Sequence, residues 1–142
     1  MGIRQAIKSK RVYFDTNVFI YLIEGFAAFE SSLQEIRDSI LHQEAEIFTS
    51  ELTLCEVLVL PFRSNNSDLA HLYRQFIEQS GAFTLLPTTR ETYIRASLYR
   101  AQMGLKMADA IHVATAVENE CEVFVSNDAG LKLPKGMALV GL

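Results

Sequence analysis

The segment Val12-Tyr13-Phe14-Asp15 joins a short apolar run, typical of a buried strand, to a carboxylate at its end. A similar junction occurs at three more acids: Glu56 is the only charge between Leu52 and Pro61, Asp109 opens the apolar helical stretch from Ala110 to Val117, and Asp128 follows Val123-Phe124-Val125-Ser126-Asn127. An ionised carboxylate is costly to bury without a partner, so these acids are expected to share one. A divalent cation is the simplest partner for all of them.

Short apolar runs alternate with longer helical patterns along the chain. Strands are predicted at residues 12–14, 47–49, 83–86, 123–126 and 138–140. Helices are predicted at residues 17–24, 32–43, 52–60, 68–80, 91–103 and 108–119, with Ser50 as the expected N-cap of the helix at 52–60. This alternation predicts an α/β fold with a central parallel sheet of about five short strands and helices on both faces.

The predicted fold gives the acids a common location. In open α/β sheets ligands bind beyond the carboxyl ends of the strands, where the strand order reverses. Asp15 and Asp128 each follow a predicted strand, so their carboxylates would face each other if those strands are neighbours. Glu56 and Asp109 would reach the same edge from the N-terminal halves of their helices.

Length and composition indicate one domain spanning residues 1–142, because 142 residues with 49% hydrophobic composition suffice for a single core. No run approaches the ~20 apolar residues of a membrane span, and the basic N-terminus has no apolar signal-peptide region behind it. We therefore expect a cytoplasmic protein that does not associate with membranes. Residues 1–11 are expected to form a flexible basic N-terminal extension.

Cysteine spacing and net charge restrict the chemistry further. Cys55 and Cys121 lie in apolar segments without metal-ligand spacing, which predicts reduced core thiols and argues against zinc. The net charge of −4 does not indicate a nucleic-acid binder. That excess equals the charge of the four singled-out acids, however, and bound cations would cancel it locally.

Four blocks of the sequence together resemble the PIN-domain ribonucleases, and most closely the VapC toxins of prokaryotic toxin–antitoxin pairs. They are Phe14-Asp15-Thr16-Asn17, the isolated Glu56, the segment Lys106-Met107-Ala108-Asp109-Ala110-Ile111-His112-Val113-Ala114-Thr115-Ala116, and Phe124-Val125-Ser126-Asn127-Asp128. The blocks occur in the family's order, and the resemblance runs from about Val12 to Val140. It implies a three-layer α/β/α fold.

The resemblance also implies a Mg²⁺- or Mn²⁺-dependent endoribonuclease that acts on RNA. Asp15, Glu56, Asp109 and Asp128 match the catalytic, metal-binding quartet of the family, and Asn17 and Ser126 match its supporting polar positions. The residue types agree with this chemistry, because such hard cations prefer carboxylate and water oxygens. A metal-activated water can then attack the phosphodiester without a side-chain nucleophile.

A toxin of this kind implies two protein partners, a cognate antitoxin and a second copy in a homodimer. The apolar run Phe19-Ile20-Tyr21-Leu22-Ile23, with Phe26 and Phe29, is a candidate antitoxin surface. The predicted helix at 91–103, with Tyr93, Leu98 and Tyr99, is a candidate dimer face. Both stripes are also compatible with ordinary core packing.

Each acid has a structural alternative. Asp15 and Asp128 fit turns, Asp109 suits a helix start, and Glu56 could pair with Arg95 or Arg100. His112 fits a hydrogen-bonded core histidine better than a metal ligand.

The functional alternatives are an RNA-processing PIN-like nuclease without an antitoxin, a haloacid-dehalogenase-like phosphatase or receiver module, and a non-catalytic binding scaffold. Asn17 stands where the phosphatases have a second aspartate, and the intact quartet argues against a scaffold.

Overall fold

The computed structural model describes residues 1–142 and contains one five-stranded sheet. Its strands are β1 (Arg11–Phe14), β2 (Glu46–Ser50), β3 (Phe83–Leu86), β4 (Val123–Val125) and β5 (Ala138–Val140). They lie in the order β3-β2-β1-β4-β5, and every neighbouring pair is parallel. The predicted parallel α/β fold is confirmed, and β3 and β5 have the predicted bounds.

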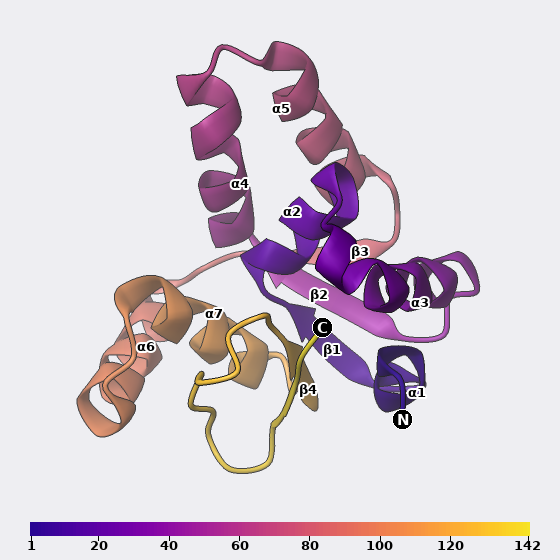
Figure 1. The fold of residues 1–142 in the computed structure, drawn as a ribbon. Helices are drawn as coiled ribbons and strands as arrows, with labels where there is room; N and C mark the ends of the chain where they lie inside the picture. The colour runs from indigo at the N-terminus through magenta and orange to yellow at the C-terminus, as the bar shows by residue number, and fades with distance from the viewer.

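Helices cover both faces of this sheet (Figure 1). They are α1 (Ile3–Ile7), α2 (Thr16–Glu24), α3 (Glu30–Leu41), α4 (Glu51–Arg63), α5 (Ser67–Arg74), α6 (Arg90–Met103) and α7 (Met107–Glu118), with a 3-10 turn at Ala27–Phe29. The helix predicted at 68–80 divides into α5 and a π-helical turn at Gln75–Gln79. No helix combines the length and apolar character needed to cross a membrane.

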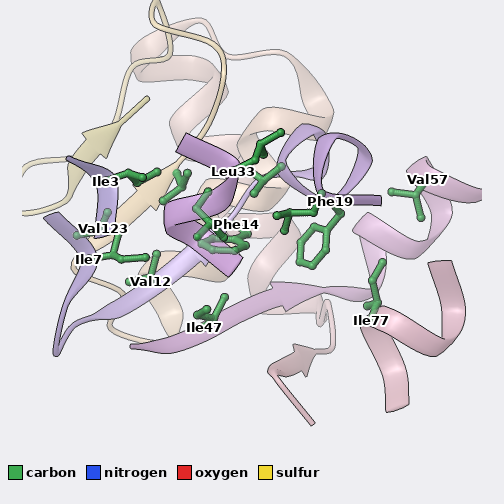
Figure 2. Packing of buried hydrophobic residues seen from close by; sticks show 14 of the residues in the cluster. Ile3, Ile7, Val12, Phe14, Phe19, Leu33, Ile47, Val57, Ile77 and Val123 are labelled. Atoms are coloured by element: carbon green, nitrogen blue, oxygen red, sulfur yellow. The ribbon is translucent and has the colours of Figure 1, made fainter. Parts of the chain in front are cut away.

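The alternation of side chains along each strand produces two separate cores. Successive strand residues point to opposite faces, so Val12 and Phe14 join one cluster while Tyr13 joins the other. The first cluster packs against α1–α5, as Figure 2 shows for Phe14, Phe19 and neighbouring side chains. The second packs against α6 and α7. This gives the three-layer arrangement and explains why β1 and β4 carry apolar residues on both faces.

The N-terminal residues differ from the expected flexible extension. Ile3 and Ile7 lie one helical turn apart on α1, are buried, and belong to the first core cluster. Arg4 donates two hydrogen bonds to Glu44, both at 2.8 Å. Lys10 leads directly into β1. The expectation is wrong because a single pair of isoleucines is enough to dock a short helix against α3, a pattern too brief to show as periodicity.

The cysteine expectation holds for only one of the two thiols. Cys121 is buried, whereas Cys55 is exposed. Thr53, Val57 and Pro61 form the buried stripe of α4 at helical spacing, and Cys55 lies outside that stripe.

Candidate functional site

The strand order reverses between β1 and β4. The chain places β2 and then β3 on one side of β1, and adds β4 and β5 on the other. Phe14 of β1 is in register with Val125 of β4, so Asp15 and Ser126 follow the two strands side by side. The backbone N–H of Asp15 donates to the carbonyl of Val125 at 3.0 Å. The first acid therefore stands at the topological switch point, where ligands bind in such sheets.

Asp15 is held rigidly at this point. It caps α2, and its Oδ1 accepts a hydrogen bond from the N–H of Thr16 at 2.8 Å. Its Oδ2 accepts from the hydroxyl of Ser126 at 2.7 Å. Asp15 is only 8% exposed, so these two donors compensate much of the cost of burying the charge. Asp15 therefore has the local turn role that was its structural alternative, and it also lies at the switch point.

Asp109 and Asp128 complete the acidic edge. Burial raises the pKa of Asp109 above its ordinary value, and the charges of Asp15 and Asp128 raise it further. The carboxylate of Asp109, in the first turn of α7, accepts no hydrogen bond from the protein. Asp128 is exposed; its Oδ1 accepts from the N–H of Gly130, and its own N–H donates to Ser126 Oγ at 3.1 Å. Ser126 thus connects the first and last acids.

The hydrogen-bond partners of Glu56 are Thr16 and His112, and not an arginine. Its Oε1 lies 2.5 Å from His112 Nε2 and accepts from the hydroxyl of Thr16 at 2.7 Å. Burial acts to raise the pKa of Glu56, but the hydrogen bonds from His112 and Thr16 outweigh it and leave the pKa below its ordinary value. His112 Nε2 is also 3.8 Å from Asp15 Oδ1, which places Glu56 beside the aspartate edge.

The sequence analysis assigned no role at this site to three residues that contact its side chains: Tyr13, Thr16 and Ser50. Tyr13 is fully buried, and its hydroxyl lies 2.6 Å from His112 Nδ1 and 2.9 Å from Ser50 Oγ. Ser50 is the N-cap residue of α4, but its side chain makes no capping hydrogen bond. The available signals were the tyrosine hydroxyl within an apolar strand and the threonine after Asp15.

The two predicted supporting residues differ in their contacts. Ser126 bonds to Asp15, as described. Asn17 is exposed, and neither oxygen of Asp15 accepts a hydrogen bond from it. A supporting contact is therefore present for Ser126 only.

The donor set agrees in kind with a hard divalent cation. Carboxylate oxygens are the ligands such cations prefer. A bound cation would also offset the repulsion that Asp15 and Asp128 exert on the unbonded carboxylate of Asp109. The side chains are not arranged closely around one point, since no group of three or more His, Cys, Asp or Glu side chains is placed to hold an ion. Asp15, Asp109 and Asp128 are the acids that this edge brings together.

A hollow of about 860 Å³ lies elsewhere on the surface. It is lined by residues 9–11, 40–41, 43–47 and 80–84, at the amino ends of β1, β2 and β3. Its basic side chains are already paired, Arg11 with Glu46 at 3.0 Å and Lys10 with Glu122 at 3.9 Å. The carboxyl edge of the sheet, with its unbonded Asp109 carboxylate, is therefore a better candidate for the functional site than this hollow.

The fold and the acidic edge define a three-layer α/β domain with Asp15 at its switch point and Asp109 and Asp128 at the same edge of the sheet. The sequence of residues 12–135 matches the family described as the PIN domain. The chain belongs to that family. No curated protein sequence matches it significantly.

Solved structures share this fold at low sequence identity. VapBC2 from Rickettsia felis bound to a promoter DNA fragment matches with a TM-score of 0.69 and 12% identity, over 92% of this chain and 98% of that chain. A toxin–antitoxin complex from Klebsiella pneumoniae matches with 0.65 and 22%, over 91% and 95%. VapC20 of Mycobacterium tuberculosis, described as a sarcin–ricin loop cleaving toxin, matches with 0.68 and 15%, over 84% and 91%. The chain therefore has the fold of VapC toxins.

Proposed function

We propose that the protein is a Mg²⁺- or Mn²⁺-dependent endoribonuclease that hydrolyses RNA phosphodiester bonds, and that it is the toxin of a toxin–antitoxin pair. The observation that carries the proposal is the acidic edge, where Asp15 is fixed by Ser126 and Asp109 keeps an unbonded carboxylate. Membership of the PIN family supports nuclease chemistry. The sarcin–ricin loop activity named for the mycobacterial neighbour supports RNA as the substrate class.

The acidic quartet that the family resemblance implies, Asp15, Glu56, Asp109 and Asp128, would hold the cation. When bound, the cation supplies an activated water and stabilises the departing oxygen. The chain itself orients the ligands: Ser126 Oγ donates to Asp15 and accepts from the N–H of Asp128, so one hydroxyl connects two acids. Lys106, exposed at the start of α7, lies close enough to lower the pKa of Asp109 and would meet an incoming phosphate.

Toxin–antitoxin complexes among the structural neighbours support an antitoxin partner. Phe19 and Leu22 of the candidate antitoxin surface are buried in the core, because the helical period turns them toward the sheet. Tyr21, Phe26 and Phe29 remain as an aromatic cluster, with ring centroids 5.0 to 5.6 Å apart. Phe26 is 45% exposed. We propose this cluster as the antitoxin contact; retained antitoxin binding by a Phe26→Asp, Phe29→Asp double variant would reject it.

A homodimer through α6 completes the proposal. Tyr93, Ile94 and Leu98 are about half exposed on this helix, whereas Tyr99 is buried and belongs to the core instead. Light scattering on the isolated chain should give twice the monomer mass. A monomer at micromolar concentration would reject the dimer without affecting the nuclease assignment.

The nuclease proposal is tested by removing the charge of one aspartate. Purified Asp15→Asn should lose RNA cleavage in Mn²⁺, while Asp68→Asn, an exposed aspartate on α5, should cleave at the parent rate. Chelation of divalent cations should abolish cleavage by the parent protein. Full cleavage by purified Asp15→Asn, with contaminating nuclease excluded, would reject the proposal.

The toxin role and the cytoplasmic location need a cellular test. Expression of the chain should arrest growth, and co-expression of the product of an adjacent small gene should restore it. Growth unaffected by an active nuclease would favour the alternative of an RNA-processing enzyme without an antitoxin.

A further inference from the structure

An aromatic cluster lies where α2 ends. It consists of Tyr21, Phe26 and Phe29, whose ring centroids are 5.0 Å apart for Tyr21 and Phe26, 5.6 Å for Tyr21 and Phe29, and 5.1 Å for Phe26 and Phe29. Tyr21 and Phe29 are partly buried and also pack against the first core cluster, whereas Phe26 is 45% exposed. Phe26 therefore presents its ring to solvent and is supported by two further rings.

The backbone on both sides of Phe26 fixes its position. Gly25 ends α2 with φ 80° and ψ 156°, a region of the backbone map that residues with a Cβ rarely occupy. Phe26 then adopts an extended conformation as the N-cap residue of the 3-10 turn at Ala27–Phe29, and its carbonyl accepts from the N–H of Phe29 at 3.0 Å. The glycine and the turn together hold the rings of Phe26 and Phe29 beside Tyr21.

A hydrogen bond connects the cluster to the acidic edge. Nδ2 of Asn127 donates to the hydroxyl of Tyr21 at 3.2 Å. Asn127 stands in the chain between Asp128 and Ser126, and the hydroxyl of Ser126 donates to Asp15 at 2.7 Å. The aromatic cluster therefore lies next to the edge at which the proposed function places the phosphodiester.

The charges around the cluster favour a nucleic-acid base over a phosphate as its occupant. The rings are uncharged, and the neighbouring carboxylates of Asp15, Asp109 and Asp128 repel a phosphate group. Glu30, the residue after the cluster, is paired with Arg37 at 3.0 Å. Binding of RNA at this edge is therefore helped by a contact that needs no charge, and the stacking of bases on aromatic rings is such a contact.

We propose that Phe26, supported by Tyr21 and Phe29, stacks an unpaired base of the RNA substrate next to the phosphodiester at the acidic edge. The inference rests on the proposed nuclease function and narrows its substrate to RNA with unstacked bases, as in loops and single strands. The bases of a duplex are already stacked and paired, so this contact discriminates against duplex RNA. An antitoxin segment on the same cluster would exclude the base, so the antitoxin contact proposed above would also block substrate binding.

Substitutions at Phe26 separate stacking from simple apolar contact. Leucine keeps an apolar side chain but has no aromatic face, whereas tryptophan offers a larger one. We expect Phe26→Leu to weaken the binding of a single-stranded oligoribonucleotide about 10-fold, and Phe26→Trp to bind it at least as tightly as the parent. Phe62→Leu is the matched control and should bind as the parent does, because Phe62 is 64% exposed on α4 and lies outside the cluster.

The fluorescence of 2-aminopurine measures the stacking itself, because this base loses emission when it stacks on a ring. The probes are single-stranded oligoribonucleotides that carry one 2-aminopurine at successive positions. They are titrated in Mg²⁺ with protein that also carries Asp15→Asn, which should not cleave them and which keeps a side-chain oxygen to cap α2. At saturating protein, Phe26→Leu should lose most of the quenching. The same probes in a duplex should not distinguish the two proteins.

Equal binding and equal quenching by the Phe26→Leu protein and its parent, with superimposable circular dichroism spectra, would overturn the inference and leave the cluster to the antitoxin alone. A loss of binding as large with the duplex as with the single strand would also overturn it, because stacking needs an unpaired base. The proposed function fails separately. If the parent cleaves no RNA in Mn²⁺ while quenching still depends on Phe26, the stacking contact stands and the nuclease assignment does not.

Discussion

Removing the Tyr13 hydroxyl should lower the free energy of unfolding substantially, because two buried side chains lose their hydrogen bonds to it. Burial raises the pKa of Tyr13 well above its ordinary value, so the hydroxyl keeps its proton and serves two partners, Ser50 Oγ and His112 Nδ1. In Tyr13→Phe the ring remains stacked on Phe124, with centroids 5.2 Å apart. The substitution therefore keeps the packing of the ring, and the change in unfolding free energy reports only the loss of the hydroxyl's hydrogen bonds.

The magnitude follows from the two partners left behind. Each lost hydrogen bond has a net value of about 1 kcal/mol, and a buried partner left unsatisfied costs about 1–3 kcal/mol. Ser50 is 0% exposed and His112 is 1% exposed, so water cannot replace the hydroxyl at either. We therefore expect Tyr13→Phe to lower the free energy of unfolding by about 2–4 kcal/mol.

Urea denaturation followed by circular dichroism measures this loss. Tyr99→Phe is the matched control, because Tyr99 is also buried at 7% exposure but its hydroxyl bonds to no protein group, and its change should stay within about 0.5 kcal/mol. The two variants should have similar m-values, since the exposed surface changes little. A loss below about 1 kcal/mol for Tyr13→Phe, or one equal to that of Tyr99→Phe, would show that Ser50 and His112 find other hydrogen-bond partners.

Three further predictions address the cation, the N-terminus and the thiols. Mn²⁺ at ten times its Kd should stabilise the protein by about 1.4 kcal/mol in thermal melts. Because the pKa of Asp109 is raised and a bound proton must leave first, the Mn²⁺ affinity should fall about tenfold per pH unit below that pKa; affinity independent of pH from 4 to 7 would contradict the role of Asp109. Ile7→Ala should cost about 2–4 kcal/mol in urea unfolding, because Ile7 is 0% exposed, whereas a frayed tail would give no change. A thiol reagent should label Cys55 in the native protein and Cys121 only after unfolding, because burial raises the pKa of Cys121 to about 12; rapid native labelling of both would contradict the buried position of Cys121.

The sequence by itself determined the alternation of strands and helices along the chain from β1 onward, and the edge of the sheet at which Asp15 and Asp128 lie. Two local patterns carry this information: apolar runs that are too short to be helices, and helical spacing in the segments between them. For this reason β3 and β5 could be predicted to the residue. Asp15 and Asp128 could be placed at one edge because parallel strands present their carboxyl ends together. That Ser126 supports Asp15 was implied by the family resemblance, and the structure supplies the contact at 2.7 Å.

Only the tertiary structure decided which partner each polar group has. Glu56 and His112 are 56 residues apart, and no local pattern distinguishes His112 from Arg95 or Arg100 as the partner of Glu56. Helical periodicity likewise leaves open which residues of an apolar stripe face the sheet, so the exposure of Phe26 and the burial of Tyr99 were undetermined. The docking of α1 depended on a surface offered by α3, some thirty residues later. Hydrogen-bond pairing and docking are set by three-dimensional proximity, and residues distant in the chain acquire it only when the sheet brings their elements together.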